Sequence, residues 1–112
     1  MKTTVVRYKT FPERADENAA LIAQVFAALE RQQPAGLRYE AMRGRDGVTF
    51  THVASVDEAP AQHPLTSLPE FQAFLAGIRE RCVEPPVQVE SVVLGRWESA
   101  PAPSAARERG LG

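Results

Sequence analysis

The sequence predicts an α+β fold with the element order βαββαβ. Two short stretches, near the start and near the end of the chain, are rich in β-branched residues, and two more flank an Asp-Gly turn. Two longer stretches carry apolar residues at helical spacing, and each lies between two of the predicted strands. Two strand–helix–strand units with right-handed crossovers give a four-stranded antiparallel sheet with both helices on one face, the ferredoxin-like arrangement. The 112 residues suffice for one such domain.

The first half of the chain begins with a strand over 3–9, which is rich in valine, threonine and tyrosine. Thr10, followed three residues later by Glu13, has the capping-box spacing that starts a helix. Apolar residues then recur at helical spacing: Leu21, Ile22, Val25, Phe26 and Leu29. We therefore expect a helix over about 13–33, which the Pro-Ala-Gly sequence at 34–36 ends.

The next two strands, over 37–43 and 48–55, flank a Gly-Arg-Asp-Gly turn and predict a β-hairpin. If Arg43 pairs with Val48, Tyr39 lies opposite His52. The face expected to pack under the helices holds Leu37, Tyr39, Ala41, Val48, Phe50, His52 and Ala54. The opposite face is mixed, because polar residues alternate there with Met42 and Val53.

The second half repeats the pattern. Ser-Leu-Pro-Glu at 67–70 has the same helix-start signature, and apolar residues at i, i+3, i+4 and i+7 extend it to a helix over about 68–82. Two prolines then separate this helix from a last strand over 87–96. The domain is expected to span 1–99, with a flexible tail over 100–112 that is rich in Pro, Ala and Gly.

Composition and charge narrow the function classes. The net charge of −1 and a sheet face without exposed aromatics disfavour a nucleic-acid partner. The longest apolar runs are too short to cross a membrane, and the first residues do not have the pattern of a signal peptide. The single cysteine, Cys82, excludes an internal disulfide, and the two histidines have no metal-site spacing. These observations predict a cytoplasmic domain without a metal.

The chain resembles the antibiotic-biosynthesis-monooxygenase group of dimeric α/β barrels. The resemblance lies in the element order, the length and the segment His63-Pro-Leu-Thr-Ser-Leu-Pro-Glu-Phe-Gln-Ala-Phe74. The resemblance covers about residues 1–97. It implies a small-molecule cavity between sheet and helices, and cofactor-free oxygenation of an aromatic or enolic metabolite. Haem-degrading relatives use an Asn on the first strand, a Trp on the third and a His on the second helix. This chain has none of the three, so no cofactor is expected.

The resemblance also implies that two sheets pack through their open faces into a barrel. The size of the chain points the same way. Two helices cover one face of the sheet, and the mixed face with Met42, Thr49, Thr51 and Val53 needs another cover. A second copy of the chain is the simplest cover, so we expect a homodimer through the open sheet face.

The candidate catalytic residues are His52 and Tyr39, which share the helix-facing side of the hairpin. An imidazole there could take or give a proton to a bound phenol or enol. The structural alternative is a buried histidine bonded to Tyr39 or to a backbone carbonyl. Four more residues are expected to line a ligand pocket: Tyr8, His63, Phe50 and Phe74. A non-catalytic dimer that binds a small molecule, or serves as an accessory subunit, remains the second functional hypothesis.

Overall fold

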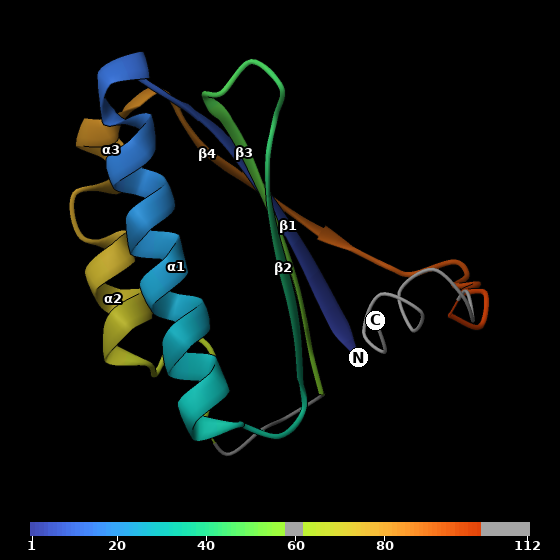
Figure 1. The fold of residues 1–112 in the computed structure, drawn as a ribbon. Helices are drawn as coiled ribbons and strands as arrows, with labels where there is room; N and C mark the ends of the chain where they lie inside the picture. The colour runs from blue at the N-terminus through green and yellow to red at the C-terminus, as the bar shows by residue number, and fades with distance from the viewer. Residues whose placement is uncertain (58–61, 102–112) are drawn as a thin grey trace, which may run out of the picture.

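The computed structural model describes residues 1–57 and 62–101. In chain order it contains β1 (Lys2–Thr10), the short 3₁₀ helix η1 (Pro12–Arg14), α1 (Ala15–Gln32), β2 (Leu37–Arg43), β3 (Thr49–Val56), α2 (Pro69–Leu75), α3 (Ile78–Arg81) and β4 (Cys82–Ser91). The strands form one sheet in the order β2-β3-β1-β4, and every neighbouring pair is antiparallel. The helices lie on one face (Figure 1). The predicted ferredoxin-like fold is confirmed.

The core lies between the sheet and the helices. Tyr8 and Phe50 come from the two central strands and are 2% and 1% exposed, and Val25 and Phe74 from α1 and α2 are equally buried. The other face of the sheet is open: Val87 and Val89 of β4 remain more than half exposed. The alternation of side chains along each strand therefore divides the sheet into a covered and an uncovered face.

The hairpin register differs from the predicted one by two residues. Arg43 pairs with Phe50, and Tyr39 with Ala54 rather than with His52. The loop is longer than expected because the carboxylate of Asp46 accepts hydrogen bonds from the backbone of Val48 and Thr49 and from the Thr49 hydroxyl. A slip of two residues leaves every side chain on its predicted face, since strand side chains alternate with period two.

Both predicted helix caps are wrong, although the helices begin near the expected positions. Thr10 ends β1, where it pairs with Cys82, and no side chain caps η1 or α1. The Ser67 hydroxyl donates to the carbonyl of His63 instead of capping α2. A proline within the first turn begins η1 and α2, because its fixed φ suits a helix start and its missing N–H needs no partner there.

The predicted second helix is divided in two. Gly77 has φ +75°, a left-handed conformation that ends one helix and begins the next. The guanidinium of Arg81 turns back to donate to the carbonyls of Phe74 and Ala76 at 2.6 and 3.1 Å. These carbonyls lie at the end of α2, where they lack helical partners and where a cation is favoured.

The last strand, β4, starts earlier than predicted and includes both prolines. Pro85 and Pro86 face Tyr8 across an irregularity in the pairing, where the register shifts between Arg7 and Lys9. An edge strand accepts prolines at such a bulge, because it has neighbours on one side only. The predicted strand over 87–96 ends at Ser91.

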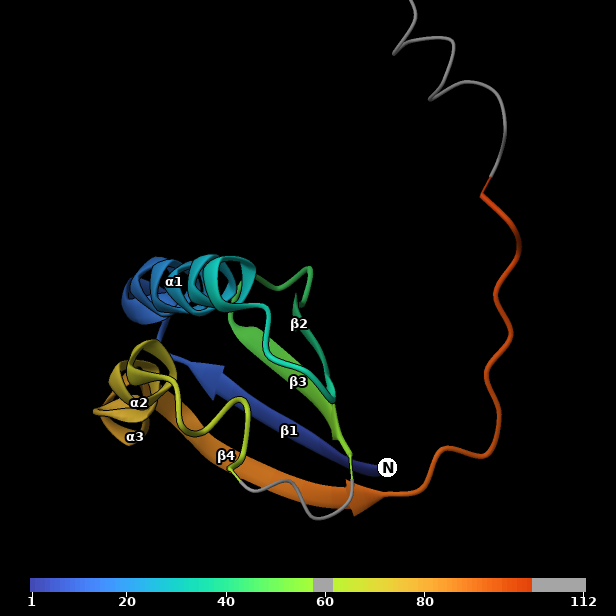
Figure 2. The same ribbon diagram turned by 90° about the horizontal axis from the view of Figure 1, so that it is seen from below.

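The chain beyond β4 runs away from the sheet over 92–101 (Figure 2). The expected tail over 100–112 lies outside the described residues from 102 onward. Within the described part, no helix is long and apolar enough to span a bilayer.

Candidate functional site

A cavity of about 820 Å³ lies on the helix side of the sheet. Its wall is mostly apolar and comes from Val6, Ala54, Val56, Leu65, Phe71, Phe74 and Ile78. Exposed residues that include Lys2, Asp57, His63 and Arg79 also line it. A polar group of three aromatic side chains, Tyr8, His52 and Tyr39, completes the lining.

These three residues come from three strands that the fold brings side by side. Tyr8 lies on β1, His52 on β3 and Tyr39 on β2. The Tyr8 hydroxyl lies 2.8 Å from Nε2 of His52, and the Tyr39 hydroxyl lies 2.6 Å from Nδ1. Both nitrogens of the imidazole are therefore bonded to phenols.

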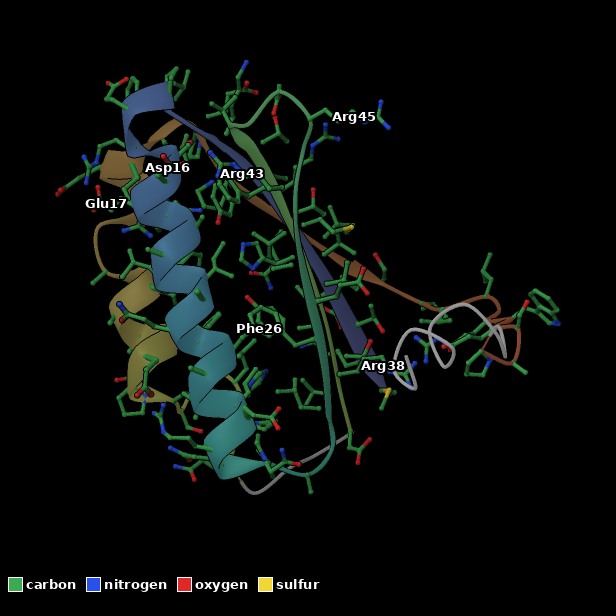
Figure 3. The ribbon with its side chains drawn as sticks, in the orientation of Figure 1. Asp16, Glu17, Phe26, Arg38, Arg43 and Arg45 are labelled. Atoms are coloured by element: carbon green, nitrogen blue, oxygen red, sulfur yellow. The ribbon has the colours of Figure 1, made fainter. Side chains whose placement is uncertain are left out.

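Neighbouring aromatic rings fix the positions of the polar group. Tyr39 stacks on Phe26 of α1 with ring centroids 5.0 Å apart, and Phe71 of α2 meets it edge-on. Phe26 points from α1 toward β2 in Figure 3. On the other side, Tyr8 stacks on Phe50 at 5.5 Å. Such ring contacts restrict the rotamers of both tyrosines.

Two buried residues extend the group away from the cavity. Nδ2 of Asn18, on α1, donates to the Tyr8 hydroxyl at 2.8 Å, and Nε of Arg81 donates to Oδ1 of Asn18 at 3.1 Å. Asn18 is fully buried and Arg81 is 2% exposed. Five side chains thus form one continuous hydrogen-bonded chain: Arg81, Asn18, Tyr8, His52 and Tyr39.

Within this hydrogen-bonded series, the imidazole of His52 and the phenols of Tyr8 and Tyr39 are neutral at neutral pH. Burial lowers the pKa of His52 to about 4, because a charged imidazole is poorly solvated there. Burial likewise raises the pKa of both tyrosines above its ordinary value, against a smaller opposing effect of the Asn18 hydrogen bond on Tyr8. The guanidinium of Arg81 is the charged member of this hydrogen-bonded series, and its positive charge also acts on the Glu17 carboxylate, whose pKa is lowered mainly by its hydrogen bond to Arg14.

The structure brings together five of the six residues expected at the site. His52, Tyr39, Tyr8, His63 and Phe74 all line the cavity. Phe50 does not line it and instead lies behind Tyr8 in the core. Nδ1 of His63 accepts the backbone N–H groups of Leu65 and Thr66, so this ring also shapes the loop before α2.

The sequence patterns did not place Asn18 and Arg81 at the site. The sequence Arg79-Glu80-Arg81 predicts a solvated helix face, which is wrong for Arg81, because the break at Gly77 turns its side chain inward. The position of Asn18 in the sequence does indicate burial. It occupies a position of the apolar stripe of α1, three residues after Ala15 and four before Ile22. A polar residue at such a position predicts a buried hydrogen bond.

The polar groups of the site are suited to hydrogen bonding. Within residues 1–57 and 62–101, no three His, Cys, Asp or Glu side chains gather in a way that could hold a metal ion. The polar members of the cavity are a neutral imidazole and two phenols, which can exchange a hydrogen bond or a proton with a ligand oxygen.

Sequence comparison identifies no relative. No protein-family model matches the chain. No curated protein sequence matches it either.

Solved structures do share its fold. An antibiotic biosynthesis monooxygenase superposes with a TM-score of 0.68 at 16% identity, covering 85% of this chain and all of the other. A mutant of SnoaB, a cofactor-independent oxygenase from Streptomyces nogalater, has a TM-score of 0.62 at 17% identity, covering 88% and 97%. A protein of unknown function from Nitrosomonas europaea has a TM-score of 0.66 at 20% identity, covering 88% and 94%. At these identities the comparison establishes a common fold, as the sequence resemblance predicted.

Proposed function

We propose that this protein is a cofactor-independent oxygenase that acts on a small aromatic or enolic metabolite in the cavity. The observation that carries the proposal is the polar group of Tyr8, His52 and Tyr39 in an otherwise apolar cavity of about 820 Å³. A cavity of this size and polarity suits a ring compound with one or two oxygen atoms. The shared fold of a cofactor-independent oxygenase supports the reaction class.

The reaction needs an electron-rich substrate. An enolisable CH₂ group loses its two hydrogens, one oxygen atom of O₂ becomes the new carbonyl, and the other leaves as water. The substrate enolate supplies the electrons. The protein's part is to bind the substrate away from water and to stabilise its anionic form. His52 and Tyr39 are the residues proposed to do this, by taking or giving a proton or hydrogen bond at the substrate oxygen.

Oxygen consumption tests the proposal. We expect hydroquinones and enolisable ring ketones to support O₂ uptake by the wild-type protein, and His52→Ala and Tyr39→Phe to reduce it at least about tenfold. Arg38→Ala is the matched control, because Arg38 lies on β2 like Tyr39 but on the opposite side of the sheet (Figure 3). Unchanged uptake in a folded His52→Ala variant would refute the catalytic role of this pair.

A second function, binding without turnover, is favoured by one observation. Both ring nitrogens of His52 already have protein partners, as in a histidine that serves packing and ligand orientation. A compound that raises the melting temperature but is never consumed would support this function.

The partner proposed for the open sheet face is a second copy of the chain. Val87 and Val89 are 63% and 53% exposed there, and Met42 at the other edge is 45% exposed. A two-fold contact between two such faces buries all three residues in each copy. A monomer at micromolar concentration would contradict this part of the proposal.

A further inference from the structure

We propose that Arg81, acting through Asn18, sets the direction of the hydrogen bonds at the cavity, so that Tyr39 offers its hydrogen to the ligand. The cavity then selects ligands with an accepting oxygen, above all an enolate or a phenolate. This inference rests on the proposed function only in taking the cavity to be a small-molecule site. It identifies Arg81 and Asn18 as positioning residues.

Arg81 determines which atom donates in the first hydrogen bond of the series. A guanidinium has only donors, so its Nε can face only an acceptor. The atom 3.1 Å away is therefore Oδ1 of Asn18, and the amide nitrogen must point to the other side. The buried cation thus fixes an amide orientation that is otherwise ambiguous.

The next link is the Tyr8 hydroxyl. Nδ2 of Asn18 donates to its oxygen at 2.8 Å, so Asn18 cannot accept the Tyr8 hydrogen. Tyr8 is 2% exposed, and its other hydrogen-bond partner in the described structure is Nε2 of His52. A buried hydroxyl hydrogen needs an acceptor, so Tyr8 donates to Nε2.

The tautomer of His52 follows. A neutral imidazole carries one N–H, and with Nε2 accepting, the hydrogen lies on Nδ1. Nδ1–H then donates to the Tyr39 oxygen at 2.6 Å. The hydrogen of Tyr39 has no other acceptor in the described part of the chain, and Tyr39 lines the cavity. The series of hydrogen bonds therefore ends at the Tyr39 hydroxyl, which donates its hydrogen to the ligand.

A ligand that donates a hydrogen bond to Tyr39 is disfavoured. If a ligand donated to Tyr39 while Nδ1–H of His52 still did so, the Tyr39 hydrogen would have no acceptor in the described part of the chain. If each link turned round instead, the Tyr8 hydrogen would face the amide N–H of Asn18, buried and without an acceptor. The geometry thus decides between the two actions of the His52–Tyr39 pair. It favours stabilising a substrate oxyanion by donation, and not removing a proton from the substrate.

The first test reads the tautomer without a ligand. In ¹⁵N NMR spectra of the wild-type protein, the His52 ring is expected to show a protonated Nδ1 and an unprotonated Nε2. The isosteric variant Asn18→Asp should exchange them, because a carboxylate beside Arg81 accepts the Tyr8 hydrogen and Tyr8 then accepts from Nε2–H. A protonated Nε2 in the wild type, or the same tautomer in folded Asn18→Asp, would overturn the inference.

The second test reads ligand selection with two matched probes. At a pH above the pKa of 4-nitrophenol, its phenolate only accepts hydrogen bonds, whereas 4-nitroaniline offers N–H donors on the same frame. The wild type should bind the phenolate at least about tenfold more tightly than the aniline, and Asn18→Asp should lose or reverse this preference. Equal binding of the two probes by the wild type would refute the inference.

The control variant is Gln24→Glu, which introduces the same charge at an exposed position of α1. It should keep the wild-type preference, and a loss there would show that the added charge alone explains the Asn18→Asp result. Oxygen uptake is a separate readout. Without uptake but with the expected tautomer and preference, the oxygenase proposal fails and this inference stands. Uptake with the opposite tautomer refutes this inference and leaves the oxygenase proposal standing.

Discussion

The hydroxyl of Tyr39 lies 2.6 Å from Nδ1 of His52, although the backbone pairs Tyr39 with Ala54 and His52 with Ala41. The contact is therefore diagonal across the hairpin. A tyrosine is long enough to reach a diagonal neighbour on the same face. The stacked ring of Phe26 holds it in that direction. The polar group at the cavity thus depends on packing from α1 as much as on strand pairing.

Removing the Tyr8 hydroxyl should destabilise the fold more than removing that of Tyr39. Tyr8→Phe leaves Nδ2 of Asn18 and Nε2 of His52 buried without partners, and we expect it to lower the free energy of unfolding by about 1–3 kcal/mol. Tyr39→Phe exposes the freed N–H of His52 toward the cavity, so its cost should stay below about 1 kcal/mol. Urea denaturation of the two variants measures the difference. A larger loss in Tyr39→Phe would contradict this order.

The burial of His52 predicts a loss of stability in mild acid. Its pKa is about 4 in the folded protein and 6.5 when exposed, so the unfolded state binds the proton more readily between these values. Stability is therefore unaffected above pH 6.5 and falls as the pH decreases toward 4, by about 3 kcal/mol for this group. The measurement is the free energy of unfolding by urea across this range.

His52→Gln is the control for this pH dependence. It keeps a polar side chain but removes the titrating imidazole, and both proteins share the same carboxylates. The difference in slope between wild type and variant isolates His52. Parallel curves would show that His52 has the same pKa in the folded and unfolded states.

The strands and their faces could be predicted from the sequence because side-chain alternation is a local pattern. The sequence places Tyr39 and His52 on the covered face correctly despite the wrong register, since a shift of two residues preserves the face. The register itself depends on the loop. The three hydrogen bonds that Asp46 accepts lengthen the loop, and a Gly-Arg-Asp-Gly sequence does not by itself distinguish this loop from a shorter turn.

The buried contact between Arg81 and Asn18 could not be predicted from the same patterns. Arg81 lies 63 residues from Asn18, and it turns inward only because Gly77 breaks the helix and leaves the carbonyls of α2 to be capped. A continuous helix over 68–82 would have carried its side chain in another direction. Long-range polar contacts of this kind arise from packing, and periodicity does not report them.

The break at Gly77 predicts an unusual sensitivity to alanine. A Cβ at this position would meet its nearest neighbour, Nη1 of Arg81, at an ordinary 3.8 Å, so the cost comes from the backbone. At φ +75° that cost is about 1–2 kcal/mol for a residue with a side chain. Gly77→Ala should lower the free energy of unfolding by this amount, measured by thermal or urea denaturation.

The matched control is Gly95→Ala. Gly95 has no atom within 4 Å of its built Cβ, and its φ is not positive, so we expect a change of less than about 0.5 kcal/mol. Equal stabilities of Gly77→Ala and the wild type would show that the segment from α2 to α3 can continue as one helix.

The open face of the sheet predicts that one added charge separates the proposed dimer. Val89 is 53% exposed in the single chain and lies on the edge strand β4, where it pairs with Val5 of the central strand β1. In a two-fold contact, Val89→Glu moves one carboxylate from each copy out of water and into the interface, and we expect the dimer dissociation constant to rise at least about tenfold. Gln88→Glu adds the same charge to the neighbouring residue, which faces the cavity side, and should leave the dimer intact. Sedimentation equilibrium at micromolar concentration measures both. A dimer that Val89→Glu leaves intact and Gln88→Glu disrupts would show that the two copies meet through another surface.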